Sequence, residues 1–431
     1  MTVGPQQEDA PRPIANATIA PAVRPSVAQA LRQRDLVIFV VSRFFSGVAM
    51  TLLRATFSWQ IFSLTGSAFA LGMIGLVQFI PTFVLSLLSG AVADRYDRRR
   101  IIQVTLVGSF ACSALLYLTT RHGHIGSVLL YSLILAAATA TAFEGPARAA
   151  LLPTLVPRPL LPAAVTLNSG VQNLAWVTGP VVMGFVIAAY GVAAAYLIHM
   201  GVIVLAFVAL AFVRSRRPAG ALAVVSLAAI REGIAFVRRR RVVLGAMTLD
   251  MFAVIFGGAT ALLPIYATEI LNVGARGYGL LSSALQIGTV VMSLVLLGLP
   301  PIHRPGRAVL AAVSVYGAAT ILFGLSRTFS LSIGACIVAG MADQISVVSR
   351  AMIIQLATPD ELRGRVSSVN LVFIGASNQL GAVESGFVAA LTGPVFSVVS
   401  GGIGALVVLF VVAILIPELR HYRIEHSDRQ L

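Results

Sequence analysis

Two long apolar segments of the chain are joined by Gly90-Ala91-Val92-Ala93-Asp94-Arg95-Tyr96-Asp97-Arg98-Arg99-Arg100, which carries four arginines and two aspartates. Apolar residues lead up to Gly90 and resume at Ile101. Because charged side chains are costly in lipid, a loop this short and this charged must lie at a membrane–water interface. Short cytoplasmic loops are enriched in Lys and Arg, so the arginines predict the cytoplasmic face.

The composition supports a membrane protein. Of the 431 residues, 58% are hydrophobic and only 11% are charged, whereas soluble domains carry about 25% charged residues. All 31 basic residues are arginine, and only Arg121, Arg276 and Arg327 fall in loops expected on the outer side. The net charge of +15 is therefore a topological signal and not a nucleic-acid patch. We expect a multi-pass protein of the cytoplasmic (inner) membrane with both termini in the cytoplasm.

The sequence predicts an all-α integral membrane fold with twelve transmembrane helices in two six-helix bundles. A span needs about 20 helical residues, and twelve apolar segments meet that length. The expected organisation is a disordered tail 1–34, a first bundle 35–213, a cytoplasmic linker 214–241 with a basic amphipathic helix, a second bundle 242–416 and a cytoplasmic tail 417–431. The predicted spans are 36–62, 69–92, 101–120, 125–147, 162–189, 192–213, 242–270, 277–299, 306–325, 330–354, 364–391 and 394–416.

The two halves repeat one another. At an offset of 202, Arg148 matches Arg350 and Gly184 matches Gly386. At an offset of 207, Gly72 matches Gly279. A parallel duplication of this kind is typical of transporters that move one bundle against the other around a central site.

The spacing G-x-x-x-D-R-x-x-R-R of the 90–100 loop resembles the loop between helices 2 and 3 of the major facilitator superfamily. Within it the chain is similar to the branch of the enterobactin exporter and the macrolide-efflux proteins, through Gly145-Pro146-Ala147-Arg148-Ala149-Ala150-Leu151-Leu152-Pro153 and Thr358-Pro359-Asp360-Glu361-Leu362-Arg363-Gly364-Arg365-Val366. The resemblance implies that Asp94 contacts Arg148 in a charged cytoplasmic gate. Asp97 departs from it, since the family usually has glycine there. The predicted gate residues are Gly90, Asp94, Arg98, Arg99, Glu144 and Arg148.

Span five carries a further motif of small residues. It resembles the glycine–proline motif of superfamily antiporters and departs from it at Met183, where a second glycine is usual. Glycine and proline in one span permit close helix packing and a local bend. Helix packing with no bearing on transport direction is the alternative. The motif residues are Gly170, Gly179, Pro180 and Gly184.

Ionisable residues at membrane depth are candidate functional sites. Asp343, near the middle of span ten, is the first candidate for a proton-titrating group, although it could instead be a structural partner of Arg350, two helical turns away. Arg43 and Asp250 are related by the 207 offset and could pair or contact substrate. Glu384 is either a second proton site or a packing partner.

Two other charged positions receive simpler interpretations. Glu144 and Arg148 have the spacing of an ion pair along one helix. Arg54 lies nearer the outer face of span one, and snorkelling towards that interface is the favoured interpretation.

The sequence has no nucleotide-binding loop, metal cluster or nucleophile arrangement, so we expect neither an enzyme nor a cofactor. The predicted function is secondary transport of a small amphipathic molecule, a siderophore or a hydrophobic drug such as a macrolide, exported in exchange for protons. A small-molecule substrate and the lipid bilayer are the expected partners, with no nucleic acid, and the protein is expected to be a monomer. Import of a small metabolite and a non-transporting receptor on the same fold are the alternatives.

Overall fold

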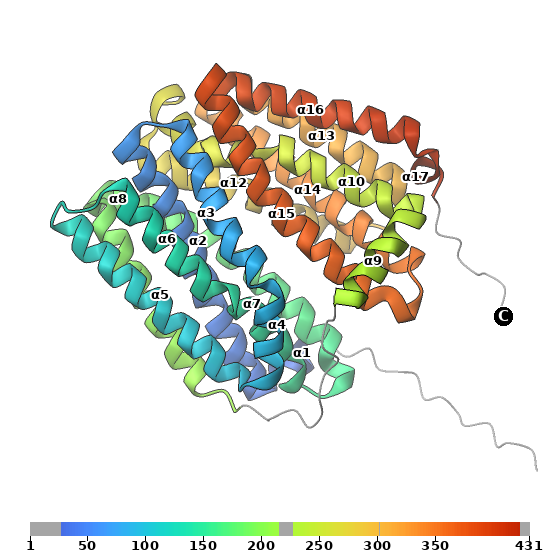
Figure 1. Ribbon diagram of the computed structural model, residues 1–431, viewed down its shortest axis with the longest axis horizontal. Helices are drawn as coiled ribbons and strands as arrows, with labels where there is room; N and C mark the ends of the chain where they lie inside the picture. The colour runs from blue at the N-terminus through green and yellow to red at the C-terminus, as the bar shows by residue number, and fades with distance from the viewer. Residues whose placement is uncertain (1–26, 215–226, 301, 423–431) are drawn as a thin grey trace, which may run out of the picture.

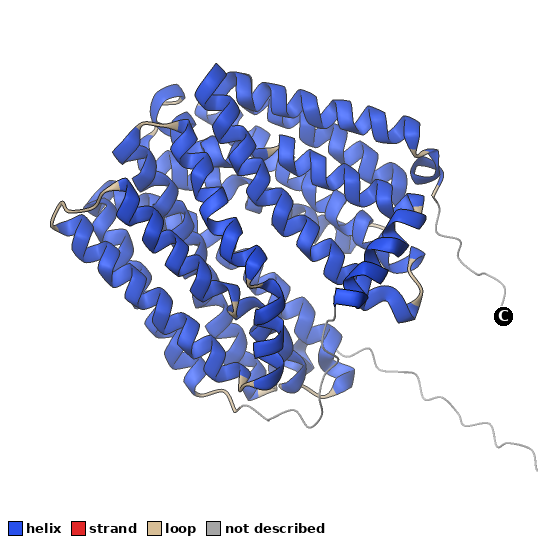
Figure 2. Cartoon of the chain, in the orientation of Figure 1, coloured by secondary structure: helices blue, strands red, loops and turns tan. Residues whose placement is uncertain are grey.

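The first half of the chain forms a bundle of long helices (Figures 1 and 2). The computed structural model describes residues 27–214, 227–300 and 302–422, and every regular element within these ranges is helical. The helices of the first half are α1 (Val27–Leu31), α2 (Arg34–Thr65), α3 (Ala68–Val84), α4 (Ser86–Arg95), α5 (Arg98–Arg121), α6 (Ser127–Ala142), α7 (Glu144–Leu151) and α8 (Leu161–Ala211), with short turns η1 (Leu152–Thr154) and η2 (Arg158–Leu160).

The second half forms an equivalent bundle, which begins after the linker helix α9. Its elements are α9 (Leu227–Arg239), α10 (Arg241–Phe256), α11 (Leu263–Ile265), α12 (Gly274–Gly298), α13 (Pro305–Leu325), α14 (Phe329–Ala357), α15 (Asp360–Thr392), α16 (Pro394–Leu415) and α17 (Pro417–His421), with η3 (Gly258–Leu262) and the π-helical turn η4 (Tyr266–Ile270).

Twelve spans can be identified in the described residues. Ten helical segments are long and apolar enough to cross a membrane by length and composition. One of them, Arg158–Ala211, is 54 residues long and is interrupted at Gly191, where φ is 79° and ψ is 174°. Glycine reaches this region because it has no Cβ, and the break divides the segment into two spans. The twelfth span is formed by α3 and α4 together.

The span predicted as one helix over 69–92 is in fact two helices. Helix α3 ends at Val84 and α4 begins at Ser86. Pro81, inside α3, lies one turn before this break, and a proline removes one backbone hydrogen bond from the helix. Helix α4 extends to Arg95 and α5 begins at Arg98, so the stretch predicted as a loop over 90–100 is mostly helical and only residues 96–97 connect the two helices.

Among the described residues, the buried contacts between the two halves gather at one end of the molecule. The largest buried cluster contains residues of both halves, among them Leu52, Met183, Leu263 and Leu281. Three further buried clusters of the described residues each belong to a single half. We call the shared end the distal end, and the opposite end, where α1, α9 and α17 lie, the terminal end (Figure 1). The halves are therefore closed against each other distally and separate towards the terminal end.

Two glycine–glycine crossings close the distal end. A Cβ on Gly184 of α8 would lie 2.7 Å from the carbonyl oxygen of Ala275 and 3.0 Å from the Cα atom of Gly279 in α12. A Cβ on Gly72 of α3 would lie 3.0 Å from the Cα atom of Gly386 in α15. The residues of one crossing are the repeat equivalents of those in the other, so the closed end follows the pseudo-symmetry of the duplication.

The segments outside the bundles differ in part from the prediction. Residues 27–31 of the expected disordered tail form α1, because the small apolar side chain of Ala30 is fully buried there. Residues 1–26 and 423–431, predicted as tails, and 215–226 of the linker lie outside the described residues. The expected linker helix is α9, which packs on α15 through buried Val237, with an ion pair between Glu232 and Arg365.

Candidate functional site

A buried ion pair lies in the second half between α10 and α14. Asp250 of α10 pairs with Arg350 of α14, and the two residues are only 8% and 4% exposed. Their alignment follows from the packing of α10 against α14. A paired charge is tolerated at membrane depth, whereas breaking such a pair leaves an uncompensated buried charge.

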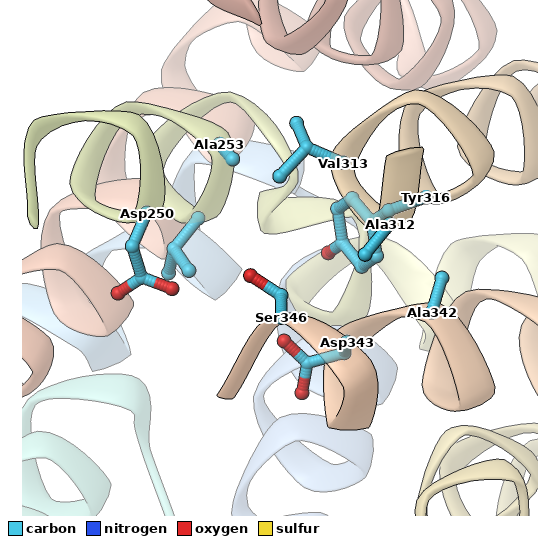
Figure 3. Close-up of a pocket in the computed structure, with 9 residues that line it drawn as sticks. Asp250, Ala253, Ala312, Val313, Tyr316, Ala342, Asp343 and Ser346 are labelled. Carbon is cyan, nitrogen blue, oxygen red and sulfur yellow. The ribbon is translucent and has the colours of Figure 1, made fainter. Parts of the chain in front are cut away.

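Asp343 lines a pocket beside this pair. The pocket is small and is lined by Asp250, Tyr316, Asp343 and Ser346 among apolar neighbours. In Figure 3 the carboxylates of Asp250 and Asp343 lie on two sides of the Ser346 hydroxyl. Within the part of the chain that the structure describes, Asp343 has no ion-pair or hydrogen-bond partner. Arg350 pairs with Asp250 instead, so the alternative in which Asp343 is the structural partner of Arg350 is not what this conformation shows.

The first half has a related but different arrangement. Arg148 of α7 pairs with Glu144 on the same helix, with 2.5 Å between Nε and Oε1. Its guanidinium also lies 6.0 Å above the ring of Phe39. Arg43 of α2 is within electrostatic range of both Glu144 and Arg148.

The expected direct pairing of Arg43 with Asp250 is wrong for this conformation, and the repeat explains why. Arg43 and Asp250 occupy equivalent positions, as do Arg148 and Arg350. In the second half, aspartate at this position pairs with the arginine of α14. In the first half the position equivalent to Asp250 is Arg43, which cannot pair with another arginine. Arg148 pairs instead with Glu144 of its own helix. Glu144 and Asp250 therefore each pair with an arginine of their own half.

The 90–100 loop is fastened to its own half by its arginines. Arg98 donates to the carbonyl oxygen of Ala150 at 2.7 Å, and Arg99 donates to those of Ala211 at 2.5 Å and Val213 at 2.9 Å. Asp97 accepts from the backbone N–H of Arg99 at 2.9 Å and caps α5. This N-cap accounts for an aspartate where glycine was expected, since Asp is among the preferred N-cap residues.

The predicted contact between Asp94 and Arg148 is absent here. Asp94 is exposed and forms no ion pair with any described residue, while Arg148 pairs with Glu144. A Cβ on Gly90 would meet nothing within 4 Å, so no helix approaches this glycine closely in this conformation. The predicted gate contact is therefore not formed in this conformation, although α4 and α7 belong to the same half.

The remaining predicted residues are Glu384 and the glycine–proline motif of span five. Glu384 is half-buried and accepts a hydrogen bond from Ser385 at 3.2 Å. A Cβ on Gly170 would meet nothing within 4 Å, whereas one on Gly179, next to buried Pro180, would lie 2.7 Å from the carbonyl oxygen of Val48. Gly179 therefore packs α8 on α2 within the half, and Gly184 packs α8 on α12 across the halves.

Two polar residues of the pocket, Ser346 and Tyr316, were not predicted. Ser346 lies one turn from Asp343, so its position on the same helical face could have been found from the spacing. Tyr316 comes from α13, and nothing in the sequence connects it to α14. Its hydroxyl donates to the carbonyl oxygen of Gly257 at 3.2 Å.

Known proteins resemble this chain over most of its length. The family model for the transmembrane secretion effector family of the major facilitator superfamily matches residues 26–430. The chain belongs to this family. It is therefore a membrane transporter and not an enzyme.

Individual members of the superfamily agree with this assignment. The Staphyloferrin A transporter of Staphylococcus aureus (strain NCTC 8325 / PS 47) is 26% identical over 276 residues, which cover 62% of this chain and 66% of that protein. The Enterobactin exporter EntS of Escherichia coli (strain K12) is 24% identical over 386 residues, which cover 89% of this chain and 92% of that protein. The crystal structure of a bacterial homologue of the human lysosomal transporter Spinster, 13% identical, has a TM-score of 0.70 and covers 91% of this chain and 98% of that one. This last similarity supports the fold.

Proposed function

We propose that this transporter exports a small amphipathic molecule from the cytoplasm in exchange for protons, by alternating access. The observation that carries the proton coupling is the second-half pocket. It holds a carboxylate without a partner, Asp343, beside a buried carboxylate–arginine pair. The relatives named as transporters of siderophores support that substrate class, and the proposed location is the cytoplasmic membrane, with the protein acting as a monomer.

The orientation follows from the arginines. Among the residues that the structure describes, most arginines lie in the loops and helix ends of the terminal end, which we therefore place in the cytoplasm. With that orientation, the conformation described above is inward-facing, because the halves are apart at the terminal end and closed at the distal end. Substrate would enter from the cytoplasm, and closure of the terminal end would bring the 90–100 stretch of the first half towards the second half.

The pocket offers a simple route for coupling. When Asp343 carries a proton, Arg350 remains with Asp250. When Asp343 loses its proton to the cytoplasm, the same cavity holds two carboxylates for one arginine, and the α10–α14 contact is weakened. A charge-assisted hydrogen bond contributes about 1.5–3 kcal/mol, which shifts a two-state equilibrium by roughly one to two powers of ten. Protonation of one side chain is thus sufficient to bias the two conformations.

The test is transport in proteoliposomes with an imposed pH gradient, with enterobactin as the probe. We expect gradient-driven flux by the parent protein and none by Asp343→Asn, which should still exchange substrate in the absence of a gradient because its cavity is intact. The matched control is Asp360→Asn, which removes an exposed carboxylate that pairs with Arg363 at the start of α15. Gradient-driven flux at the parent rate in Asp343→Asn would remove Asp343 from the coupling role.

A further inference from the structure

Arg54 is an exposed cation in the middle of a buried helix. Its neighbours in α2 are buried, with Leu53 at 5% and Ala55 at 7% exposure, yet the Arg54 side chain is exposed. Because α2 is covered by neighbouring helices at Leu53 and Ala55 but not at Arg54, the Arg54 side chain must point into an open space. The question is whether this space is lipid or the gap between the halves.

The contacts one turn further along α2 are made with the other half. The Tyr278 hydroxyl of α12 donates to the carbonyl oxygen of Ala55 at 3.3 Å and lies within hydrogen-bonding reach of Ser58. The Trp59 ring stacks on the Tyr278 ring, with 5.6 Å between the centroids. The part of α2 beside Arg54 therefore faces α12 and not lipid.

The same helical face continues towards the terminal end within the protein. Residues spaced by three or four share a face, and Arg43, Gly47, Met50 and Arg54 follow this spacing. Gly47 packs against Ala175 of α8, and Arg43 is near the Glu144–Arg148 pair. At Gly47 this face is covered by α8 of the same half, and beside Arg54 it adjoins Tyr278 of the other half.

These contacts favour a position between the halves over the snorkelling interpretation of Arg54. Thr65, at the distal end of α2, is about 16 Å from Arg54 along the helix axis at about 1.5 Å per residue. An arginine side chain does not extend that far. The guanidinium therefore does not reach the distal end of α2.

The charge of Arg54 is not compensated by the protein. It has no ion-pair partner among the residues that the structure describes, and the Ser58 and Tyr278 hydroxyls beside it are neutral. Arg43, on the same face, has a second arginine, Arg148, and one carboxylate, Glu144, nearby, and Glu144 already pairs with Arg148. An arginine at membrane depth without a partner is expensive and marks a substrate or ion pathway.

We propose that Arg54 binds a negatively charged group of the transported molecule at the closed end of the cavity. Half-buried Trp59, which stacks on buried Tyr278, lies one turn beyond it and is the aromatic side chain available to an apolar part of the same molecule. The substrate class is then an anionic amphipathic compound, such as one with carboxylate or phenolate groups, and cationic amphipathic drugs are disfavoured. This inference rests on the proposed export function for its biological meaning, although binding itself requires neither a proton gradient nor a transport direction.

The test compares two dyes built on one ring system: fluorescein, which is anionic, and tetramethylrhodamine methyl ester, which is cationic. Binding to the purified full-length protein in detergent is measured by fluorescence anisotropy. We expect saturable binding of fluorescein by the parent and a Kd increased roughly 10- to 100-fold in Arg54→Gln, since hydrogen bonds to charged groups contribute about that factor. Arg54→Lys should retain part of the affinity because it retains the charge.

Arg121→Gln is the matched control, because it removes an exposed arginine of the same half at the end of α5. It should bind fluorescein like the parent. Thermal unfolding of each variant establishes that the protein is folded. Absence of saturable fluorescein binding by the parent, equal binding of the two dyes, or equal affinity in the parent and in both Arg54 variants would overturn the proposal. Loss of gradient-driven transport with this binding intact would instead count against the proton-coupled export function.

Discussion

The glycine crossing between α8 and α12 predicts that one added methyl group will open the distal end. In Gly184→Ala the new Cβ would lie 2.7 Å from the carbonyl oxygen of Ala275 and 3.0 Å from the Cα atom of Gly279. Carbon atoms at their optimal separation are about 3.5–4.0 Å apart, so the two halves must move apart by a fraction of an ångström or more. Overpacking of this kind costs about 1–3 kcal/mol.

The cost applies only to the conformation in which the distal end is closed. It therefore changes the ratio of the two conformations by roughly 5- to 100-fold, since about 1.4 kcal/mol is tenfold. Gly170→Ala is the matched control on the same helix, because a Cβ at Gly170 meets nothing within 4 Å. Both substitutions place alanine within α8 and raise helix propensity equally, so that only the contact across the halves distinguishes them.

Accessibility of an introduced cysteine measures the shift. Ser58→Cys places a thiol beside Tyr278, in a background where the buried cysteines Cys112 and Cys336 are replaced by alanine. A membrane-impermeant maleimide added to intact cells should label this thiol faster in Gly184→Ala than in the parent, and at the parent rate in Gly170→Ala. Equal labelling in all three proteins would refute the argument that this crossing holds the distal end closed.

Two further predictions concern the charged residues. Asp250→Asn leaves Arg350 buried without its partner and should lower the free energy of unfolding by about 3–5 kcal/mol, as measured by denaturant unfolding in detergent. The double variant Asp250→Asn with Arg350→Gln should lose less stability than Asp250→Asn alone. An Asp250→Asn protein as stable as the parent would contradict the buried pairing. Asp94→Asn should leave stability in this conformation unchanged, because the residue is exposed and unpaired, but should slow turnover about tenfold or more if a bond of about 1.5–3 kcal/mol forms only when the terminal end closes. Flux measurements with cysteine labelling from the cytoplasmic side check this. Normal turnover would mean that the 90–100 stretch marks the cytoplasmic side but has no gating role.

The architecture could be predicted because the relevant signals are local. Apolar segments of the right length and the repeated motifs were sufficient for an all-α fold of twelve spans. The break between the two parts of the second span was missed, since Pro81 alone does not specify whether a helix bends or ends. Helix α1 could not be predicted because the composition of the tail indicates disorder. Its five residues become helical where they pack against α2 and α8.

The candidate site was harder to predict because it depends on which faces meet. Arg43 and Asp250 could be assigned equal depth from the repeat, but depth does not specify a partner, and Asp250 pairs with Arg350 instead. For Arg54, sequence distance to the interface suggested snorkelling, whereas the contacts of Ala55 and Ser58 with Tyr278 place it between the halves. Tyr316 could not have been found, since its place beside Asp343 depends on the packing of two different helices.

The glycine crossings at the distal end also bear on how fast this protein can change conformation. An interface made of long side chains must reorder their rotamers each time it closes, and each ordered side chain adds up to about 1.5–2 kcal/mol of lost entropy, whereas glycine adds none. At Gly72, Gly184, Gly279 and Gly386 the two halves meet with backbone against backbone. At these positions closure requires no search among side-chain conformations, and opening releases no side chains that must later be ordered again. The distal contact is therefore suited to repeated opening and closing at a small entropic barrier, while discrimination between substrates is left to the side chains deeper in the cavity.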